Sequence, residues 1–491
     1  MRLKTHLNAT ASAIAIALAI AAWPATAQQA DPLKAAVEKA VLGNPDVSSR
    51  FNAYRAALDA VDVARAAYRP RLDLSASVGH DSDRITSRSP EAQSMSRNGA
   101  SLALTQLLWD GLGTRDEVRR TSHERLARYF EFIDTAEQTA LEAARAYYDV
   151  LRYRRLVQLA EDNYVQHKYA ALQIQSRFKA GVGRGVDLEQ ANARLALAES
   201  NLSTEVANLH DVTARYQRVV GELPPAKLPA EIPLIKGLPA KAEDTTEAAI
   251  RQNAAVSASI EALRSARSLA DERRAAYQPR VEARLRSGSG KNFDGIRDQK
   301  RDSSAEIVLN WNLYNGGADQ ARIRQQVNLV GQAEDLRDKA CRDTRQQATV
   351  AFNDTRKLVE QLELLDRNTI AIEKARDAYR QQFDIGQRSL LDLLNAENEV
   401  YTAKRAYANA EYDLGIAYAR AHAAMSRLTT QLGIARVDAA APDASGWSAD
   451  GDAPARCPVT AIDVTSTDRA VLDERAREIA GSVAPVAPRK P

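Results

Sequence analysis

Cysteine is almost missing from this chain. Its 491 residues include two, Cys341 and Cys457. Two thiols are too few for a disulfide-stapled scaffold and lack the spacing of a zinc site, so both classes of protein are excluded. At most one bridge can form, and the sequence leaves open whether the two cysteines pair.

Aromatic residues and an excess of either charge are also scarce. Aromatics make up 5% of the chain, which leaves little bulk for several small compact cores. The 67 basic residues nearly balance the 64 acidic ones, so no whole-chain field indicates nucleic acid as a partner. Charged residues still reach 27%, with abundant Ala, Leu, Glu, Gln and Arg, which is typical of long helices.

Long apolar runs are confined to the first residues. Arg2 and Lys4 precede an apolar stretch at 9–22, and Ala-Thr-Ala at 25–27 follows it, the pattern of a secretory signal peptide. The stretch is shorter than the ~20 residues of a transmembrane helix. We therefore expect residues 1–27 to be removed and the mature chain to leave the cytoplasm. An uncleaved amphipathic anchor is the alternative.

Catalytic and metal-binding signatures are missing as well. The six histidines are scattered, and no H-E-x-x-H motif occurs. The glycines of residues 181–185 have neither a preceding strand nor the Lys-Ser/Thr pair of a phosphate loop, so we interpret them as a turn between helices. We expect no enzymatic activity, no metal and no cofactor.

What the chain does contain is an internal repeat. Two segments recur 209 residues later: N-P-D-V at 44–47 matches 253–256, and Y-R-P-R at 68–71 matches 277–280. Two later segments recur at an offset of 205 residues: 109–111 matches 314–316, and 178–181 matches 383–386. One insertion or deletion between residues 70 and 109 explains the change of offset. A repeat of this length indicates two copies of one structural unit.

Each unit is predicted to run helix, two strands, long helix, short turn and helix, with helical periodicity from about 33 to 69 in the first. We expect a first structural repeat at 28–221, with a β-hairpin at 70–110 and helices at 113–180 and 186–221. A proline-rich linker at 222–242 leads to the second repeat at 243–432, with a hairpin at 279–315 and helices at 318–384 and 389–432. The tail comprises residues 433–491. We expect much of the tail to be disordered or associated with the linker, with one short helix at 468–479.

The strands are predicted from period-two alternation. Apolar residues alternate at 72–78 and 102–108 in the first half, and at 281–285 and 307–313 in the second. Strands of about ten residues match those that cross an outer membrane, with polar loops at 82–99 and 287–304. The aromatic residues at the strand ends fit an interfacial girdle, with ordinary core packing as the alternative: Trp109, Trp311, Tyr314 and Tyr277.

The lengths and the strand number together predict an assembly. Helices of nearly 68 residues would be about 100 Å long and must pack side by side as coiled-coil-like rods. Four strands cannot close a sheet, and lipid tolerates no open strand edge. Three copies would give twelve strands around an open lumen. The fold class is therefore mainly α, a long α-helical barrel with a β-barrel portion of four transmembrane strands per chain, closed by trimerisation.

These motifs together resemble the TolC family of outer-membrane exit ducts over residues 31–432. The motifs that carry the resemblance are N-P-D-V, Y-x-P-R, the strand exits W-D-G and Y-N-G-G, and the turns at 178–191 and 383–396. The resemblance implies a homotrimer in outer-membrane lipid, a helical tunnel across the periplasm, a periplasmic adaptor protein and an inner-membrane ABC or proton-driven pump. Transport energy would come from that pump.

The resemblance also implies a gate at the hairpin tips. Arg388 would be a gate cation, with Asp187 of the neighbouring hairpin as its partner. Asp392 would form a ring of carboxylates by symmetry, a selectivity filter for cations. Alternatively, both aspartates only cap the helices that follow. Two positions depart from the family, Phe383 in place of a tyrosine and Asn395 in place of a second aspartate. The tip turns, where an adaptor would dock, contain Gly181, Val182, Gly183, Gly386 and Gln387.

The cargo is a separate question. The segments 183–191 and 195–202 are most similar to members that serve type I secretion of large proteins, such as biofilm adhesins. No cysteine lies near the cleavage point, so an N-terminal lipid, common in drug-efflux members, is not expected. Small-molecule efflux is the alternative within this class. A periplasmic coiled-coil scaffold without a pore is the alternative outside it.

Overall fold

The structure is a computed structural model that describes residues 32–87, 89–229, 233–292, 297, 299–434, 447–449, 457, 459 and 468–482. The predicted signal peptide at 1–27 lies outside these residues, as does much of the tail.

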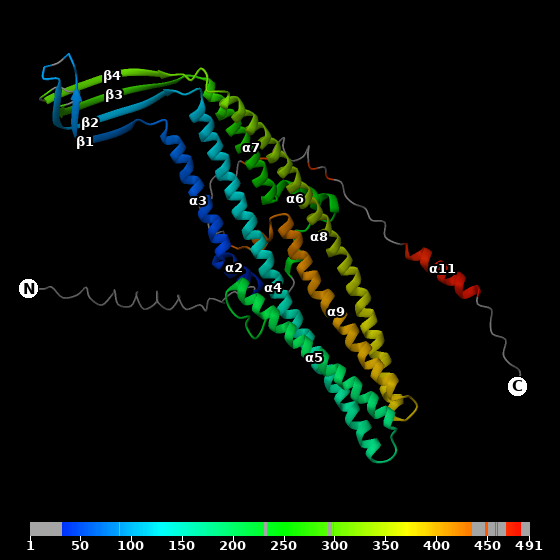
Figure 1. Ribbon diagram of the computed structural model, residues 1–491. Helices are drawn as coiled ribbons and strands as arrows, with labels where there is room; N and C mark the ends of the chain where they lie inside the picture. The colour runs from blue at the N-terminus through cyan, green and yellow to red at the C-terminus, as the bar shows by residue number, and fades with distance from the viewer. Residues whose placement is uncertain are drawn as a thin grey trace, which may run out of the picture.

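Two helices of 67 residues set the length of the molecule. These are α4 (Gly113–Lys179) and α8 (Ala318–Asp384), each about 100 Å long at 1.5 Å per residue. Shorter helices lie along them in end-to-end pairs, α3 (Pro45–Ala66) with α5 (Gly185–Val220), and α7 (Ala254–Arg274) with α9 (Leu390–Ala424) (Figure 1). The second pair packs between α4 and α8. The predicted rods are confirmed to within one residue at each end.

A four-stranded antiparallel sheet extends from one end of the rods (Figure 1). Its order is β1 (Arg71–Arg84), β2 (Ala92–Trp109), β3 (Arg280–Lys291) and β4 (Gln299–Asn310). The central β2–β3 pairing joins the two halves of the chain. Among the described residues of one chain, no strand pairs with the outer edges of β1 and β4.

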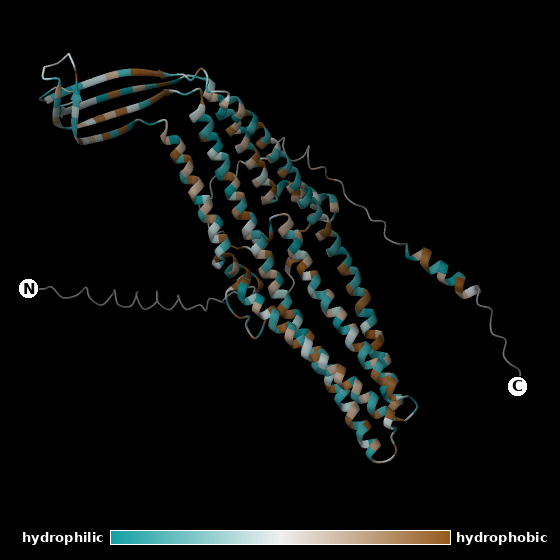
Figure 2. Ribbon diagram, in the orientation of Figure 1, coloured by the Kyte–Doolittle hydropathy of each residue, from teal (hydrophilic) through white to brown (hydrophobic). Residues whose placement is uncertain are grey.

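The two faces of the sheet differ in polarity. Residues paired across the strands point to one face, and the register aligns Leu72 with Leu104 and Leu285 in one row. Neighbouring positions of this face add Leu74, Leu102, Ile307 and Leu309, whereas the row of Val78, farther from the helices, pairs it with Asn98. The opposite face carries the polar row Arg71, Thr105, Arg284 and Glu306. Figure 2 shows apolar segments on the half of the sheet nearer the helices.

The strands are longer than predicted, at 12 to 18 residues. The polar segments 82–99 and 287–304, expected to be loops, are largely strand. Polar side chains pair across the first hairpin where the apolar rows end, as in the Arg97–Asp81 ion pair at 3.3 Å. The strands therefore remain paired beyond the point where their apolar residues end. At the other end β4 stops at Asn310, so Trp311 and Leu313 lie outside the strand that was predicted to hold them.

The helix predicted at 33–69 is two helices, α2 (Pro32–Gly43) and α3. The break is at Asn44, whose side-chain oxygen accepts a hydrogen bond from Asp46 N at 2.8 Å, while Pro45 occupies the first turn. The second half repeats the break. Asn253 caps α7 and separates it from α6 (Ala242–Gln252). The repeated asparagine of the sequence motif is thus a helix cap.

The helix predicted at 389–432 is also interrupted. It comprises α9 and the short α10 (Leu428–Gln431), separated at Met425–Arg427, where Ser426 has a φ of 50°. The buried carboxylate of Glu137 on α4 accepts hydrogen bonds from the backbone N–H groups of Leu428 and Thr429 at 2.9 and 3.2 Å. This acid caps α10 and fixes the turn.

The linker and the described tail residues lie on the helices. The linker contains the 3₁₀ turn η1 (Pro233–Ile235) and packs on α4 and α9 through hydrogen bonds from Tyr147 to Pro229 O (2.8 Å) and between His422 and Leu234 O (2.9 Å). In the tail, Cys457 is disulfide-bonded to Cys341 of α8, with Cα atoms 5.6 Å apart. The helix predicted at 468–479 is α11 (Arg469–Ser482).

The main core surrounds the middle of α4. It includes Tyr54, Tyr147 and Tyr148, all fully buried. A Cβ on Gly415 of α9 would come within 2.9 Å of the Tyr148 ring, so the glycine permits close packing of α4 against α9.

Among the described residues, no helix combines the length and the apolarity needed to cross a membrane.

Candidate functional site at the hairpin tips

Two helix-turn-helix tips close the end of the molecule opposite the sheet (Figure 1). Both turns have the same backbone. Gly181 and Gly386 have φ values of 75° and 78°, the left-handed region that glycine adopts without strain. The next residues, Val182 and Gln387, donate N–H groups to carbonyls five residues back at 3.1 and 2.8 Å. These are Schellman motifs, in which the two glycines end the incoming helices of the tips.

Asp392 lies in the first turn of the second tip's outgoing helix, three residues after its N-cap. Ser389 is the N-cap of α9, and its hydroxyl accepts from Asp392 N at 3.2 Å and donates to the Asp392 carboxylate at 2.9 Å. The N-cap of this helix is therefore Ser389, and the Asp392 carboxylate accepts a hydrogen bond from the capping hydroxyl instead of capping the helix itself. The Asp392 carboxylate is still 40% exposed, so it can also face a lumen.

Arg388 is held within its own tip in a single chain. Its guanidinium lies 3.7 Å from the Asp392 carboxylate, donates to Gln382 Oε1 at 3.0 Å, and lies 4.8 Å from the centre of the Tyr379 ring. Asp187 lies in the first turn of α5, and its side chain contacts neither Arg388 nor the N-cap among the described residues of one chain. An Arg388–Asp187 pair would have to join two hairpins in an assembly.

Phe383 is a packing residue of the tip. Its side chain is 5% exposed among Ala170, Ile174 and Leu394, and the Arg177 guanidinium lies 5.0 Å from its ring centre. It therefore joins α8 to α4 and α9 through apolar contact. A ring without a hydroxyl suits this position.

Asn395 joins the two hairpins of one chain. Its side-chain oxygen accepts a hydrogen bond from Arg194 Nη2 of α5 at 2.8 Å. The amide thus connects α9 to α5, a contact that the repeat pattern of the sequence does not reveal.

Glu397, two residues beyond Asn395 on α9, is a functional candidate that the sequence analysis missed. The side chain is buried, and its carboxylate accepts from Arg376 at 3.0 Å and from Arg380 at 2.5 Å. Arg380 also donates to Gln166 of α4 at 2.6 Å. This cluster of Glu397, Arg376, Arg380 and Gln166, here called the Glu397 latch, ties α8, α9 and α4 together.

The sequence did carry a signal for the latch. Glu397 continues the apolar stripe of Leu390, Leu393 and Leu394 at helical spacing, so it is an acid on a buried face. Arg376 and Arg380 are one turn apart on the facing helix. His167 of α4 is also buried close to the latch, and burial lowers the pKa of its imidazole.

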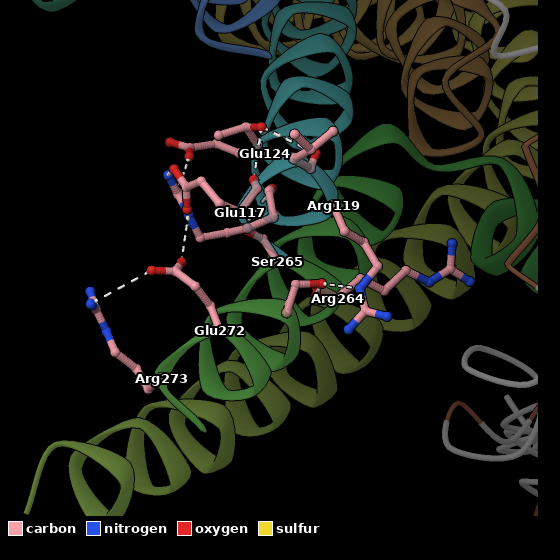
Figure 3. Close-up of polar contacts among 11 residues, drawn as sticks. Glu117, Arg119, Glu124, Arg264, Ser265, Glu272 and Arg273 are labelled. Atoms are coloured by element: carbon pink, nitrogen blue, oxygen red, sulfur yellow. Dashed lines mark hydrogen bonds and ion pairs between the residues drawn. The ribbon is translucent and has the colours of Figure 1, made fainter. Parts of the chain in front are cut away.

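A second polar cluster, drawn in Figure 3, lies where α4 and α7 adjoin the strands β2 and β3 in the chain. Arg120 of α4 donates to both oxygens of Glu117 at 2.7 Å and to Glu124 at 2.8 Å. Glu272 of α7 faces this group, 4.0 Å from Arg120 Nε and 3.6 Å from Arg273. Burial and the Glu117 carboxylate raise the pKa of Glu272 to about 7, whereas the hydrogen bond from Arg120 lowers the pKa of Glu117.

Glu117 and Glu272 also line a cavity of about 520 Å³ where helices and strands meet, with Gln278, Arg280 and Asn310 at its strand side. No group of three or more potential metal-ligating side chains occurs among the described residues.

Comparisons with known proteins agree with this architecture. The family model described as "Outer membrane efflux protein" matches residues 36–222 and 246–426, which are the two structural repeats. Among relatives, the outer membrane efflux protein BepC of Brucella suis is 26% identical over 437 residues, covering 88% of this chain and 93% of BepC.

Two further relatives cover similar shares of the chain. The outer membrane protein TolC of Escherichia coli is 24% identical and covers 82% of this chain and 84% of TolC. The alkaline protease secretion protein AprF of Pseudomonas aeruginosa is 24% identical and covers 78% of this chain and 81% of AprF.

A solved structure extends the likeness to the fold. The outer-membrane channel OprN superposes with a TM-score of 0.72 at 21% identity, covering 80% of this chain and 90% of OprN. The overall fold is thus shared with a protein that is named as an outer-membrane channel. The predicted resemblance is confirmed, and the chain belongs to the outer membrane efflux protein family of TolC-like outer-membrane channels.

Proposed function

We propose that three copies of this chain form a passive, gated exit duct for type I secretion of a large protein. The observation that carries the duct is the sheet, which has one apolar face and two unpaired edges at the end of 100 Å rods. Lipid tolerates no open strand edge, and three such sheets would close a barrel of twelve strands. The helices would continue the lumen through the periplasm.

In this proposal the partners are those of the family. A periplasmic adaptor would dock at the tip turns, and an inner-membrane pump would supply the energy, because a passive duct has no source of its own. The AprF relative, named for protease secretion, supports a protein cargo. The BepC relative, named for efflux, supports the alternative of small molecules.

Step conductance in a planar bilayer tests the duct. Purified protein should give discrete, cation-preferring steps and should fractionate with the outer membrane. A non-conducting protein found in the periplasmic fraction would instead support a scaffold without a pore. The cargo needs a second experiment, quantitative proteomics of medium and cell surface in a deletion strain and its complemented parent. Loss of one large protein supports type I secretion, and an unchanged set supports small-molecule efflux.

The gate is proposed at Arg388, Asp187 and Asp392. In a closed trimer, Asp187 of one hairpin would pair with Arg388 of the next, because Asp187 is free of ion pairs among the described residues of its own chain. Arg388→Ser and Asp187→Ala should each raise resting conductance several-fold. Asp392→Ala should reduce the preference for cations, since three carboxylates near one axis attract them. Unchanged conductance in the first two variants would mean that other contacts hold the tips closed.

A further inference from the structure

Charge is divided between the two faces of the sheet. The pairing register places every carboxylate of the described strands on the polar face, namely Asp73, Asp81, Asp83, Glu282, Asp302 and Glu306. Basic residues of that face pair with them, as Arg286 does with Asp302 at 3.2 Å. The titratable side chains that the described strands add to the apolar face are all basic. That face therefore carries no negative charge among the strand residues that the structure describes.

Basic residues occupy the apolar face beyond its apolar rows. His80 and Arg84 lie on β1, where Arg84 pairs with the loop residue Glu91 at 3.1 Å. Lys291 of β3 and Arg301 of β4 are both exposed. Neither of these two forms an ion pair with any other described residue. Two cations are thus open to a ligand from outside the chain.

The register brings Lys291 and Arg301 together. Ser289 lies opposite Arg301 and two residues before Lys291, so the two cations are diagonal neighbours on one face, about 7–8 Å apart between Cα atoms. Asn98 of β2 lies opposite Lys291 on its other side. Ammonium, guanidinium, hydroxyl and carboxamide groups all donate hydrogen bonds, and a guanidinium can bind two phosphate oxygens at once. These four residues, Lys291, Arg301, Ser289 and Asn98, are here called the Lys291 patch, and they suit a phosphate group.

The Lys291 patch lies at the height expected for lipid headgroups. Arg301 is nine residues from the end of β4 at Asn310, and Lys291 is eleven residues from the start of β3 at Arg280. At about 3.4 Å per residue and a strand tilt of about 40°, the two positions are about 23 and 29 Å above the end of the sheet nearest the helices. The apolar band of an outer-membrane barrel is about 25 Å tall. The patch would therefore sit at the outer boundary of the hydrocarbon.

Closing a barrel would add no negative charge to the Lys291 patch. β4 is an edge strand, so in a trimer β1 of the next copy would lie beside Arg301. On β1 the apolar face ends in His80 and Arg84, which are exposed, whereas Asp81 and Asp83 lie on the less exposed polar face. The more exposed face of a curved sheet is its convex side, which turns outward when the sheet closes. The patch would therefore face lipid with its positive charge intact.

We propose that the Lys291 patch binds the phosphate group of a phosphorylated lipid in the outer leaflet of the outer membrane. The inference rests on the proposed trimeric duct, in which the apolar face contacts lipid and the far ends of the strands lie outside the cell. The apolar rows below the patch, with Leu102 and Leu285, would contact the acyl chains of the same lipid. Basic residues next to an apolar surface bind phosphorylated headgroups in this way.

Native mass spectrometry of the full-length protein in detergent, with added bisphosphorylated lipid A, tests the patch. The double variant Lys291→Gln, Arg301→Gln should bind this lipid about tenfold more weakly than the parent, because two charged donors are lost. The matched control Arg286→Gln, Lys300→Gln removes the same charge from the polar face of the same two strands and should bind like the parent. Equal affinities in all three proteins, or equal losses in both variants, would overturn the proposal.

Two further probes separate a lipid from free phosphate. Dephosphorylated lipid A should bind the parent no better than it binds the Lys291→Gln, Arg301→Gln variant, and inorganic phosphate should not displace the bisphosphorylated lipid. Displacement by inorganic phosphate alone would overturn the assignment to a lipid. The same spectra report the assembly: a trimer whose lipid binding is independent of the patch contradicts this proposal alone, and a monomer contradicts the trimeric duct on which it rests.

Discussion

At the residue scale, the tips depend on one buried acid. The Glu397 carboxylate is the shared acceptor for Arg376 and Arg380, and through Arg380 it reaches Gln166 of α4. Glu397→Gln should remove the carboxylate that Arg380 shares with Arg376 and leave Arg376 with Asp377 alone, at a cost of about 1–3 kcal/mol of stability. Because the latch lies about 10 Å above the tip turn, at 1.5 Å per residue, the change should also raise resting conductance in a bilayer.

A matched control exists on the neighbouring helix. Glu205 of α5 is equally buried and pairs with Arg405 of α9 at 2.7 Å, but it lies about 30 Å from the tip at 1.5 Å per residue. Glu205→Gln should lower stability by a similar amount and leave conductance unchanged. If both variants raise conductance equally, general loosening of the bundle, and not the latch, controls the tips.

A second acid makes stability depend on pH. The folded Glu272 carboxyl titrates near 7, whereas the unfolded one titrates near its ordinary 4.5. Between these values the folded chain holds a proton that the unfolded chain has lost, so the free energy of unfolding falls as pH rises through this window and levels off above it. Denaturant unfolding from pH 5 to pH 8 should show this decline, and Glu272→Gln should reduce it.

Asp271→Asn is the control for that pH series. Asp271 is the neighbour of Glu272 in the chain, but it pairs with Arg119 at 2.7 Å and takes no part in the contact between Glu272 and Glu117. This variant should retain the decline of the parent. A decline that survives Glu272→Gln would assign the pH dependence to another group.

At the scale of elements, the repeated asparagine caps permit an internal comparison. Asn44 caps α3 at the surface, whereas Asn253 caps α7 while buried and also donates to Ala424 O of α9 at 3.0 Å. Asn44→Ala should lower the free energy of unfolding by about 1 kcal/mol, the usual contribution of an N-cap side chain. Asn253→Ala should cost about 2–3 kcal/mol, since it also leaves a buried carbonyl unpaired. Equal losses by chemical denaturation would contradict the tertiary role of Asn253.

The same elements show what the sequence could predict. The bounds of α4 and α8 followed from long runs without proline and from glycine turns, which are local signals. The break at Asn44 was also signalled locally, by an asparagine before a proline, but periodicity continued across it and concealed it. The contacts Arg194–Asn395 and Glu397–Arg380 depend on which faces of distant helices meet, and no local pattern encodes this. The Cys341–Cys457 bridge likewise joins the repeat to a tail outside it.

At the scale of the whole molecule, the polarity of the sheet decides which way the assembly faces lipid. Leu74 is 75% exposed near the centre of the apolar face, and the adjacent Ser75 points to the polar face. Arginine on the lipid side of a barrel costs about 2–4 kcal/mol near the bilayer midplane. Leu74→Arg should therefore lower the amount of protein in the outer membrane and its heat resistance in detergent. Ser75→Arg should leave both nearly unchanged, because a lumen holds water. If Ser75→Arg caused the stronger defect, the face of Ser75 would be the one toward lipid. The polar row that contains Arg284 and Glu306 would then have to be buried between subunits.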